Sequence, residues 1–229
     1  MNIIINGGTR GIGKEIVICL AQDSNNKILV TGRNKNVLED LSLRFGNVHH
    51  MILDLSEIDE YIDPFSELVK HLFENVDILI NIAGLLIAKP FADLTNNDAR
   101  LMMEVNFIAP SSLIRIVKPL MKNGSHIVNI SSMGGFQGSS KYKGLSYYSA
   151  SKASLACLTE CLSTEFHGTG IVVNCLALGS VQTEMLSEAF PDYKAPLQAK
   201  DMAVYISEFA LKGNKFFNGK ILPVALSNP

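Results

Sequence analysis

Short apolar runs alternate with longer segments of helical periodicity along almost the whole chain. The runs are nearly continuously apolar rather than alternating, which is typical of parallel strands that are buried on both faces. The predicted strands are Asn2–Asn6, Lys27–Thr31, Val48–Leu53, Asp77–Ile82, Ser125–Ser131, Ile171–Leu176 and Lys220–Val224. The predicted helices between them are Ile12–Gln22, Lys35–Phe45, Glu57–Phe73, Asn97–Met121, Tyr148–Phe166 and Lys200–Leu211.

This alternation predicts an α/β fold built from right-handed βαβ units. We expect a Rossmann-type, doubly wound parallel sheet of about seven strands with helices on both faces. Pro223 lies inside the last run and fits an edge strand, where a missing N–H is tolerated. No linker or shift of composition divides the 229 residues, so a single domain spanning 1–229 is predicted.

Composition and charge exclude several classes of function. The net charge of −2 and the mixture of charges along the chain argue against a nucleic-acid partner. The apolar segment Ile78–Ala88 is too short to span a membrane and contains Asn81 and Gly84. No secretory signal precedes Asn6, so a cytoplasmic location is expected.

The cysteines and histidines show no metal-ligand spacing, so no metal is expected. Cys157 and Cys161 are four residues apart on a predicted helix, and Cys19 and Cys175 are isolated. We interpret Cys157 and Cys161 as buried, reduced thiols. The pair His49-His50 falls in a predicted strand, so its side chains should point to opposite faces.

A glycine-rich turn joins the first predicted strand to the first helix. The segment reads Gly7-Gly8-Thr9-Arg10-Gly11-Ile12-Gly13. A turn of this kind presents free backbone N–H groups and a helix N-terminus to a pyrophosphate, and its glycines allow the ligand to approach closely. Its place in a first βαβ unit favours dinucleotide binding over a plain structural turn.

The end of the second strand bears on which dinucleotide is bound. NAD-binding sites usually carry an acidic residue about 20 residues past the glycines. Here the strand ends Thr31-Gly32-Arg33-Asn34, with an arginine and no carboxylate. A guanidinium can hold a 2′-phosphate through two hydrogen bonds, and Arg10 could approach the same phosphate. These residues favour NADP(H), the alternative being two solvated arginines.

The segment Tyr148-Ser149-Ala150-Ser151-Lys152 begins a strongly helical stretch. The spacing of four residues places the Tyr148 phenol and the Lys152 ammonium on one helix face. A cation close to a phenol stabilises the phenolate, so we expect Lys152 to lower the pKa of Tyr148 toward the range of an acid–base catalyst. Tyr147 has no lysine four residues on, because position 151 is serine.

Taken together, these blocks resemble the short-chain dehydrogenase/reductase family, in its compact branch with the TGxxxGxG and YxxxK motifs, which includes 3-oxoacyl reductases. The resemblance covers essentially the whole chain. The strand Ile127–Ser132 ends in a serine pair and matches the family block in which the second serine is catalytic. The resemblance therefore implies Ser132 as the residue that binds the substrate oxygen, with Ser131 as the structural alternative.

The resemblance also implies the remaining site residues. Asn106 matches the asparagine that holds a water linking Lys152 to solvent, although it could equally be a plain polar contact. The implied catalytic set is Asn106, Ser132, Tyr148 and Lys152. The implied cofactor-binding set is Gly7, Thr9, Arg10, Gly11, Ile12, Gly13, Arg33, Asp54, Leu55, Asn81, Ala83, Gly84, Tyr148, Lys152, Gly179, Val181 and Thr183. Within it, Asp54 would contact the adenine and Asn81 would stabilise the sheet centre.

Four features depart from the family pattern. Asn6 replaces a threonine, and Leu178 replaces the proline of the PGxVxT block. The substrate loop, about Glu184–Pro196, looks short and favours an open site or a small or carrier-tethered substrate. The end Val224-Ala225-Leu226 replaces an aspartate and two glycines, which puts the usual subunit contacts there in doubt.

The resemblance implies an NADPH-dependent carbonyl reductase or alcohol dehydrogenase with Tyr148 as general acid and base. Its substrate would be a small ketone or secondary alcohol, one form being a 3-oxoacyl thioester. The alternative is a non-catalytic NADP(H)-binding regulator on the same fold, since a fold does not guarantee an activity. Relatives form homodimers or homotetramers through their long helices, here Asn97–Met121 and Tyr148–Phe166, so a homo-oligomer is expected.

Overall fold

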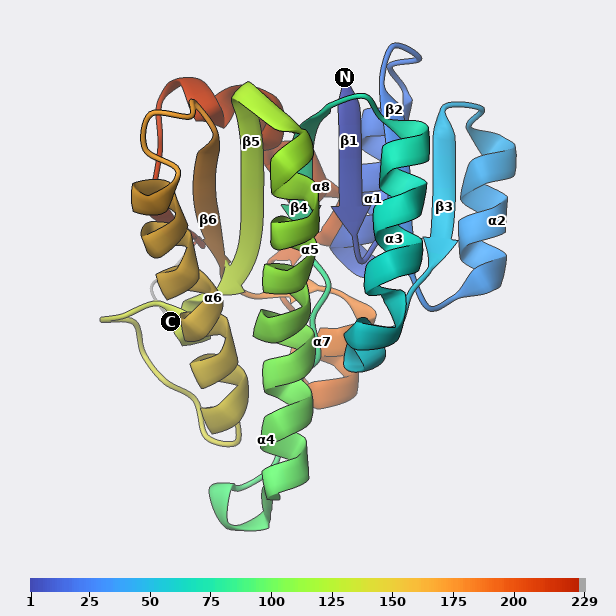
Figure 1. Ribbon diagram of the computed structural model, residues 1–229. Helices are drawn as coiled ribbons and strands as arrows, with labels where there is room; N and C mark the ends of the chain where they lie inside the picture. The colour runs from blue at the N-terminus through green and yellow to red at the C-terminus, as the bar shows by residue number, and fades with distance from the viewer. Residues whose placement is uncertain (227–229) are drawn as a thin grey trace.

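The computed structural model describes residues 1–226 and contains a seven-stranded parallel sheet in the order β3-β2-β1-β4-β5-β6-β9 (Figure 1). The strands are β1 Asn2–Asn6, β2 Lys27–Gly32, β3 Val48–Ile52, β4 Val76–Asn81, β5 Met121–Ser132, β6 Val172–Leu178 and β9 Ile221–Val224. The helices are α1 Gly11–Ala21, α2 Lys35–Arg44, α3 Ile58–Leu72, α4 Asn96–Met103, α5 Ala109–Val117, α6 Ser146–Glu165, α7 Glu184–Ala189 and α8 Ala199–Lys212. The predicted Rossmann-type fold is confirmed.

Two hydrophobic cores cover the two faces of the sheet. Residues of α1, α2 and α8 form one core, and residues of α3 and α5 and the end of α6 form the other. Figure 1 shows α3, α5 and α6 on the near face and α1 and α8 behind the sheet. The isoleucines of β1 explain why its sequence does not alternate, because Ile3 and Ile5 enter the first core while Ile4 enters the second.

One predicted helix is wrong in extent. α4, a π-helical turn at Glu104–Ile108 and α5 form one continuous helical stretch, which ends in a 3-10 turn at Lys118–Leu120 before it reaches Met121. Pro119 lies in this last turn and lacks the N–H that a further helical bond would need. Met121 therefore begins β5, four residues earlier than the predicted strand.

A small lobe follows β6 that the sequence pattern did not predict. The strand β7 Val181–Gln182 pairs in parallel with β8 Leu197–Gln198, and α7 lies between them. The Thr183 hydroxyl accepts a hydrogen bond from Leu186 N at 3.3 Å and so caps α7.

β9 is an edge strand, as the position of Pro223 predicted. Lys220 O accepts from Cys175 N at 2.8 Å, and Val224 O accepts from Gly179 N at 2.9 Å. Because backbone groups alternate in direction along a strand, Pro223 presents its nitrogen to the open side of the sheet.

The prediction that Cys157 and Cys161 are buried thiols is wrong. Both lie on the exposed face of α6, whereas Leu155, Ala156 and Thr159 fill the buried face. The spacing of four residues placed the two thiols on one face correctly but did not show which face meets the sheet. Within residues 1–226, no helix is long and apolar enough to cross a membrane.

Candidate functional site

A cavity of about 600 Å³ opens over the carboxyl ends of the strands. Open α/β sheets bind ligands at this place, where the order of the strands reverses. Here the reversal falls between β1 and β4. Most of the residues predicted from the sequence line this cavity, with Asn81 and Asn106 lying behind its wall.

The glycine loop is shaped by contacts that leave no room for side chains. Gly7 has φ +103°, and a Cβ there would lie 2.5 Å from Ala83 N. A Cβ on Gly13 would collide with the carbonyl oxygen of Gly7. Arg10 is the N-cap residue of α1 without a side-chain cap, and the first turn contains no acidic residue. The N–H groups at this helix end are therefore available to a phosphate, so the loop fits a dinucleotide.

The two predicted phosphate-binding arginines both have carboxylate partners. Arg10 Nη1 lies 3.4 Å from Glu188 Oε1 of α7. Arg33 Nη1 lies 3.9 Å from Asp54 Oδ2. Both guanidinium groups are largely exposed, so these ion pairs are weak and leave the arginines able to bind a ligand anion.

The structure brings Ser132, Tyr148 and Lys152 together at the end of β5. The Ser132 hydroxyl lies close enough to the Tyr148 phenol to affect its pKa, and it accepts from Gly134 N at 3.1 Å. Ser131 instead donates to Lys152 O at 2.8 Å and is buried, which gives it the structural place of the pair. Tyr147 packs against Phe91 with ring centroids 5.7 Å apart and does not line the cavity.

The expected lowering of the pKa of Tyr148 is contradicted. Burial of the phenol raises its pKa, and the hydrogen bond with Ser132 opposes this only in part. Lys152 Nζ donates to Ile130 O at 2.9 Å, and burial lowers the pKa of the ammonium to about 8. The four-residue spacing correctly predicted that Tyr148 and Lys152 share a helix face. It could not predict that both groups are removed from water, which is the largest influence on their pKa values.

Asn106 lies in the π-helical turn and is fully buried. Its Oδ1 accepts from Leu85 N at 2.7 Å, and its Nδ2 donates to Leu85 O at 2.8 Å and to Ser151 Oγ at 2.9 Å. A Cβ on Gly84 would lie 3.2 Å from Lys152 Nζ and 3.4 Å from Asn106 Oδ1. The side chain of Asn106 thus ties the segment after β4 to α6, directly beside Lys152.

Asn81 belongs to a chain of buried polar side chains that crosses the sheet below the cavity. Thr31 donates to Asn6 Oδ1 at 3.1 Å, and Asn6 donates to Asn81 Oδ1 at 3.5 Å. Asn81 donates in turn to Asn129 Oδ1 at 2.9 Å, and Asn129 to Thr159 Oγ1 of α6 at 3.0 Å. Asn6, in place of threonine, is long enough to join β2 to this chain.

Several lining residues were missed by sequence reasoning. Met185, Leu186, Phe190 and Tyr193 line the cavity from the α7 lobe. Their apolar spacing after the Thr183 cap was the available signal for an amphipathic turn. The loop 139–146 contributes Tyr142 and Leu145, which also went unpredicted.

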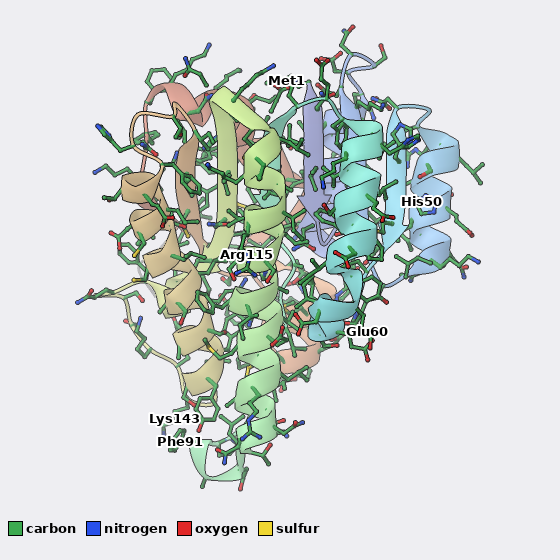
Figure 2. All side chains as sticks on the ribbon, in the orientation of Figure 1. Met1, His50, Glu60, Phe91, Arg115 and Lys143 are labelled. Atoms are coloured by element: carbon green, nitrogen blue, oxygen red, sulfur yellow. The ribbon has the colours of Figure 1, made fainter. Side chains whose placement is uncertain are left out.

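That loop meets the segment 89–93 at one end of the molecule. Lys89 N donates to Gly144 O at 3.2 Å, and Figure 2 shows Phe91 and Lys143 at this end.

Across the described residues, no group of three or more His, Cys, Asp or Glu side chains could hold a metal ion.

Comparisons with known proteins agree with this geometry. Residues 1–194 match the short chain dehydrogenase family. An uncharacterized oxidoreductase of Staphylococcus saprophyticus is 30% identical over 206 residues, which is 87% of this chain and 86% of that protein.

Solved structures show the same likeness. A blue fluorescent protein from a metagenomic library, in complex with NADPH, is 26% identical with a TM-score of 0.85, covering 99% of this chain and 96% of that one. A 4-hydroxyisoleucine dehydrogenase mutant complexed with NADH and succinate is 25% identical with a TM-score of 0.87, covering 98% and 97%. The chain belongs to the short-chain dehydrogenase family, whose members are oxidoreductases that bind a nicotinamide cofactor and act on small molecules.

Proposed function

We propose that this protein is an NADPH-dependent carbonyl reductase or alcohol dehydrogenase that interconverts a ketone and a secondary alcohol. The observation that carries the proposal is the meeting of Ser132, Tyr148 and Lys152 beside a glycine loop with an uncapped helix N-terminus. A 3-oxoacyl thioester is one ketone of this kind. The short-chain dehydrogenase family provides the reaction type, and the side chains named here provide the roles.

NADPH, when bound, supplies a hydride from C4 of its nicotinamide to the carbonyl carbon. Ser132 donates a hydrogen bond to the carbonyl oxygen and stabilises the negative charge that develops there. Tyr148 gives its phenolic proton to the same oxygen, so that an alcohol forms. Lys152 returns a proton to the phenolate, and a water held at Asn106 connects Lys152 to solvent.

The cofactor would be held along the cavity from the glycine loop to the lobe after β6. Gly7, Thr9, Gly11, Ile12 and Gly13 would bind the pyrophosphate. At the other positions Asp54 and Leu55 would contact the adenine, Ala83 and Gly84 would pass beside the cofactor, and Gly179, Val181 and Thr183 would meet the nicotinamide. All of these residues line the cavity.

The preference for NADP rests on Arg10 and Arg33. Each would release its carboxylate partner and bind the 2′-phosphate, which offers more negative charge than one exposed carboxylate. Solved relatives bind either cofactor, one with NADPH and another with NADH, so the arginines of this chain decide the assignment.

We further propose a cytoplasmic homodimer or homotetramer that assembles through α5 and α6. Ile108, beside the start of α5, is 40% exposed, and the face of α6 that carries Cys157 and Cys161 is also exposed. Helix faces of this kind are buried by packing against a second copy.

Replacing Tyr148 by phenylalanine tests the reaction. Tyr148→Phe removes the proton donor, so NADPH consumption with a panel of ketones should fall by about 10²- to 10⁴-fold. Binding of NADPH, followed by its fluorescence, should be retained. Tyr147→Phe is the matched control, because that neighbouring hydroxyl lies outside the cavity and its loss should leave the rate unchanged.

Two results would contradict this mechanism. Turnover that survives Tyr148→Phe would exclude Tyr148 as the proton donor. A wild-type protein that binds NADPH but reduces or oxidises no member of a broad panel would favour the non-catalytic regulator.

The affinities for NADPH and NADH test the cofactor assignment. The wild type should bind NADPH more tightly, and Arg33→Ala should weaken NADPH binding by about 10- to 100-fold with little effect on NADH, as expected for a lost charge-assisted hydrogen bond. Arg44→Ala, which removes an arginine outside the cavity, is the control. Equal affinities for the two cofactors in the wild type would overturn the assignment.

A further inference from the structure

We propose that the substrate of this site is a neutral, predominantly apolar ketone or secondary alcohol, and that α7 and the segment after it select against charged substrates. The inference rests on the proposed function, since it assigns the half of the cavity beyond Ser132 and Tyr148 to the substrate. It is carried by the distribution of charge around the cavity and by the way the α7 lobe is attached.

The charged residues that line the described cavity are Arg10, Arg33, Asp54, Lys152 and Glu184. Arg10, Arg33 and Asp54 follow β1, β2 and β3, which form one half of the sheet. The Glu184 carboxylate also faces this half, because its Oε2 lies 3.4 Å from the position of a Cβ on Gly11. Four of the five charges therefore surround the predicted dinucleotide.

The fifth charge, on Lys152, is not available to a substrate. Lys152 is only 3% exposed, and its ammonium donates to Ile130 O at 2.9 Å. A substrate that reaches the Ser132 hydroxyl thus finds no accessible cation or anion among the described residues of this half.

Apolar residues line the substrate half of the cavity. They are Met133 after β5, Leu145 before α6, Leu178 at the end of β6, and Leu186 and Phe190 of the α7 lobe. Ala225 closes the end beyond β9, packed against Gly179, where a Cβ would lie 2.7 Å from the Ala225 Cβ. An apolar pocket with a few polar groups that fix orientation is the usual design for a largely apolar ligand.

The α7 lobe is fastened at both ends, so its apolar side is held over the cavity. β7 and β8 pair at the two ends of the lobe, and Ala195 N donates to Gln182 Oε1 at 2.9 Å. The Tyr193 hydroxyl is hydrogen-bonded to Ser180 Oγ at 2.9 Å. Tyr193 thereby has a partner for its polar end and presents its ring to the cavity.

A carboxylate in this half would lose its water without gaining a counter-charge. Such burial is strongly unfavourable, whereas each added methylene of a neutral chain gains from leaving water. On this proposal the small substrate that the short loop favours is an uncharged one.

The test compares 2-pentanone with levulinate, which has the same five-carbon chain with a carboxylate in place of the terminal methyl group. With NADPH, kcat/KM should be about 100-fold or more higher for 2-pentanone. In the series 2-pentanone, 2-heptanone and 2-nonanone, kcat/KM should rise by about fourfold per methylene until the cavity is filled.

A charge placed on the lobe should invert the preference. Leu186→Lys puts an ammonium into the substrate half, so kcat/KM for levulinate should rise about tenfold or more while that for 2-pentanone falls. Ala189→Lys adds the same charge on α7 at a residue that does not line the cavity and should leave both values unchanged.

The outcomes separate this inference from the proposed function. Reduction of levulinate at least as efficient as that of 2-pentanone would overturn the inference and leave the reductase assignment intact. If no ketone is reduced and no secondary alcohol is oxidised, the proposed function fails. Calorimetric binding of the same two compounds to the protein loaded with NADP⁺ then decides the inference: tighter binding of 2-pentanone supports it, and equal binding, tighter binding of levulinate or no binding overturns it.

Discussion

Lys152 combines almost complete burial with a hydrogen bond to a neutral acceptor, the carbonyl of Ile130. Burial lowers the pKa of its ammonium from 10.5 to about 8. The folded protein therefore carries this charge at neutral pH at a cost in stability. Residues held for function often destabilise the fold in this way.

Lys152→Met should make the protein more stable at pH 7. Above pH 10.5 the lysine is neutral in both the folded and the unfolded state, and burying it costs nothing. As the pH falls from 10.5 through 8, the unfolded state takes up the proton first, so the folded state loses stability. The charged lysine thus costs about 3 kcal/mol of stability at pH 7. Lys152→Met removes this cost but also loses the hydrogen bond to Ile130 O, which is worth about 1 kcal/mol. The net gain of about 2 kcal/mol at pH 7 should become a loss of about 1 kcal/mol above pH 10.5, where only the missing hydrogen bond counts.

Urea unfolding between pH 7 and 11 measures this effect. Lys70→Met is the control, because Lys70 is exposed and its replacement should give no pH-dependent change. If Lys152→Met is destabilising by the same amount at every pH, the ammonium carries no burial cost and the explanation is wrong.

At this scale the sequence predicted where the site residues lie better than how they behave. Ser132 and Tyr148 could be placed because a strand end and a helix face fix their positions. The pKa of Tyr148 could not be predicted, because it depends on water excluded by chain segments far away in the sequence.

Among the elements, β5, β6 and α8 are joined by one buried histidine. His126 Nδ1 lies 3.0 Å from Ala210 O of α8, and its Nε2 lies 3.1 Å from Asn174 Nδ2 of β6. The carbonyl can only accept, so Nδ1 carries the proton and Nε2 accepts from the amide. The imidazole is therefore held neutral, and burial lowers its pKa to about 4.

His126 should make the fold sensitive to mild acid. Its pKa is lowered in the folded state, so the stability it contributes is present above 6.5 and is lost as the pH falls through 4. The loss should reach about 3 kcal/mol. His126→Gln should flatten the dependence of unfolding free energy on pH between 6.5 and 4, whereas His71→Gln, at an exposed histidine, should not. An unchanged pH dependence in His126→Gln would contradict this account.

The elements that the sequence predicted well are those with a long apolar pattern. β1 matches its predicted bounds Asn2–Asn6, and α2 differs from its predicted range by one residue. α7, β7 and β8 were missed because elements of two to six residues give only a short apolar pattern, and because β7 and β8 pair across 16 residues of chain. The π-helical turn inside the helix predicted over Asn97–Met121 contains Asn106, whose tertiary contacts no local pattern shows.

For the whole molecule, light scattering tests the proposed assembly. A homodimer or homotetramer should be observed, and Ile108→Glu should shift it toward the monomer, because a carboxylate buried between helices would lack a partner. Leu43→Glu is the control at another strongly exposed apolar residue, on α2 rather than on the α5 and α6 face. A wild-type monomer would refute the proposal.

The overall architecture was the most predictable level. Sheet order follows from the alternation of strands and helices and from the handedness of βαβ connections. Consecutive isoleucines in β1 point to opposite faces of the sheet, so both faces must be covered by an apolar core. The structure has one core on each face. The sequence did not predict the part of the cavity lining that comes from the α7 lobe, because this lobe folds back over the cavity from a segment that follows β6.

The proline at the open edge of β9 has a consequence for the protein in a crowded solution. An extended segment of another chain that approached this edge would need the N–H that Pro223 lacks. The strand therefore makes a poor template for the growth of intermolecular sheets, because a single proline ring interrupts the row of hydrogen-bonding groups at this edge.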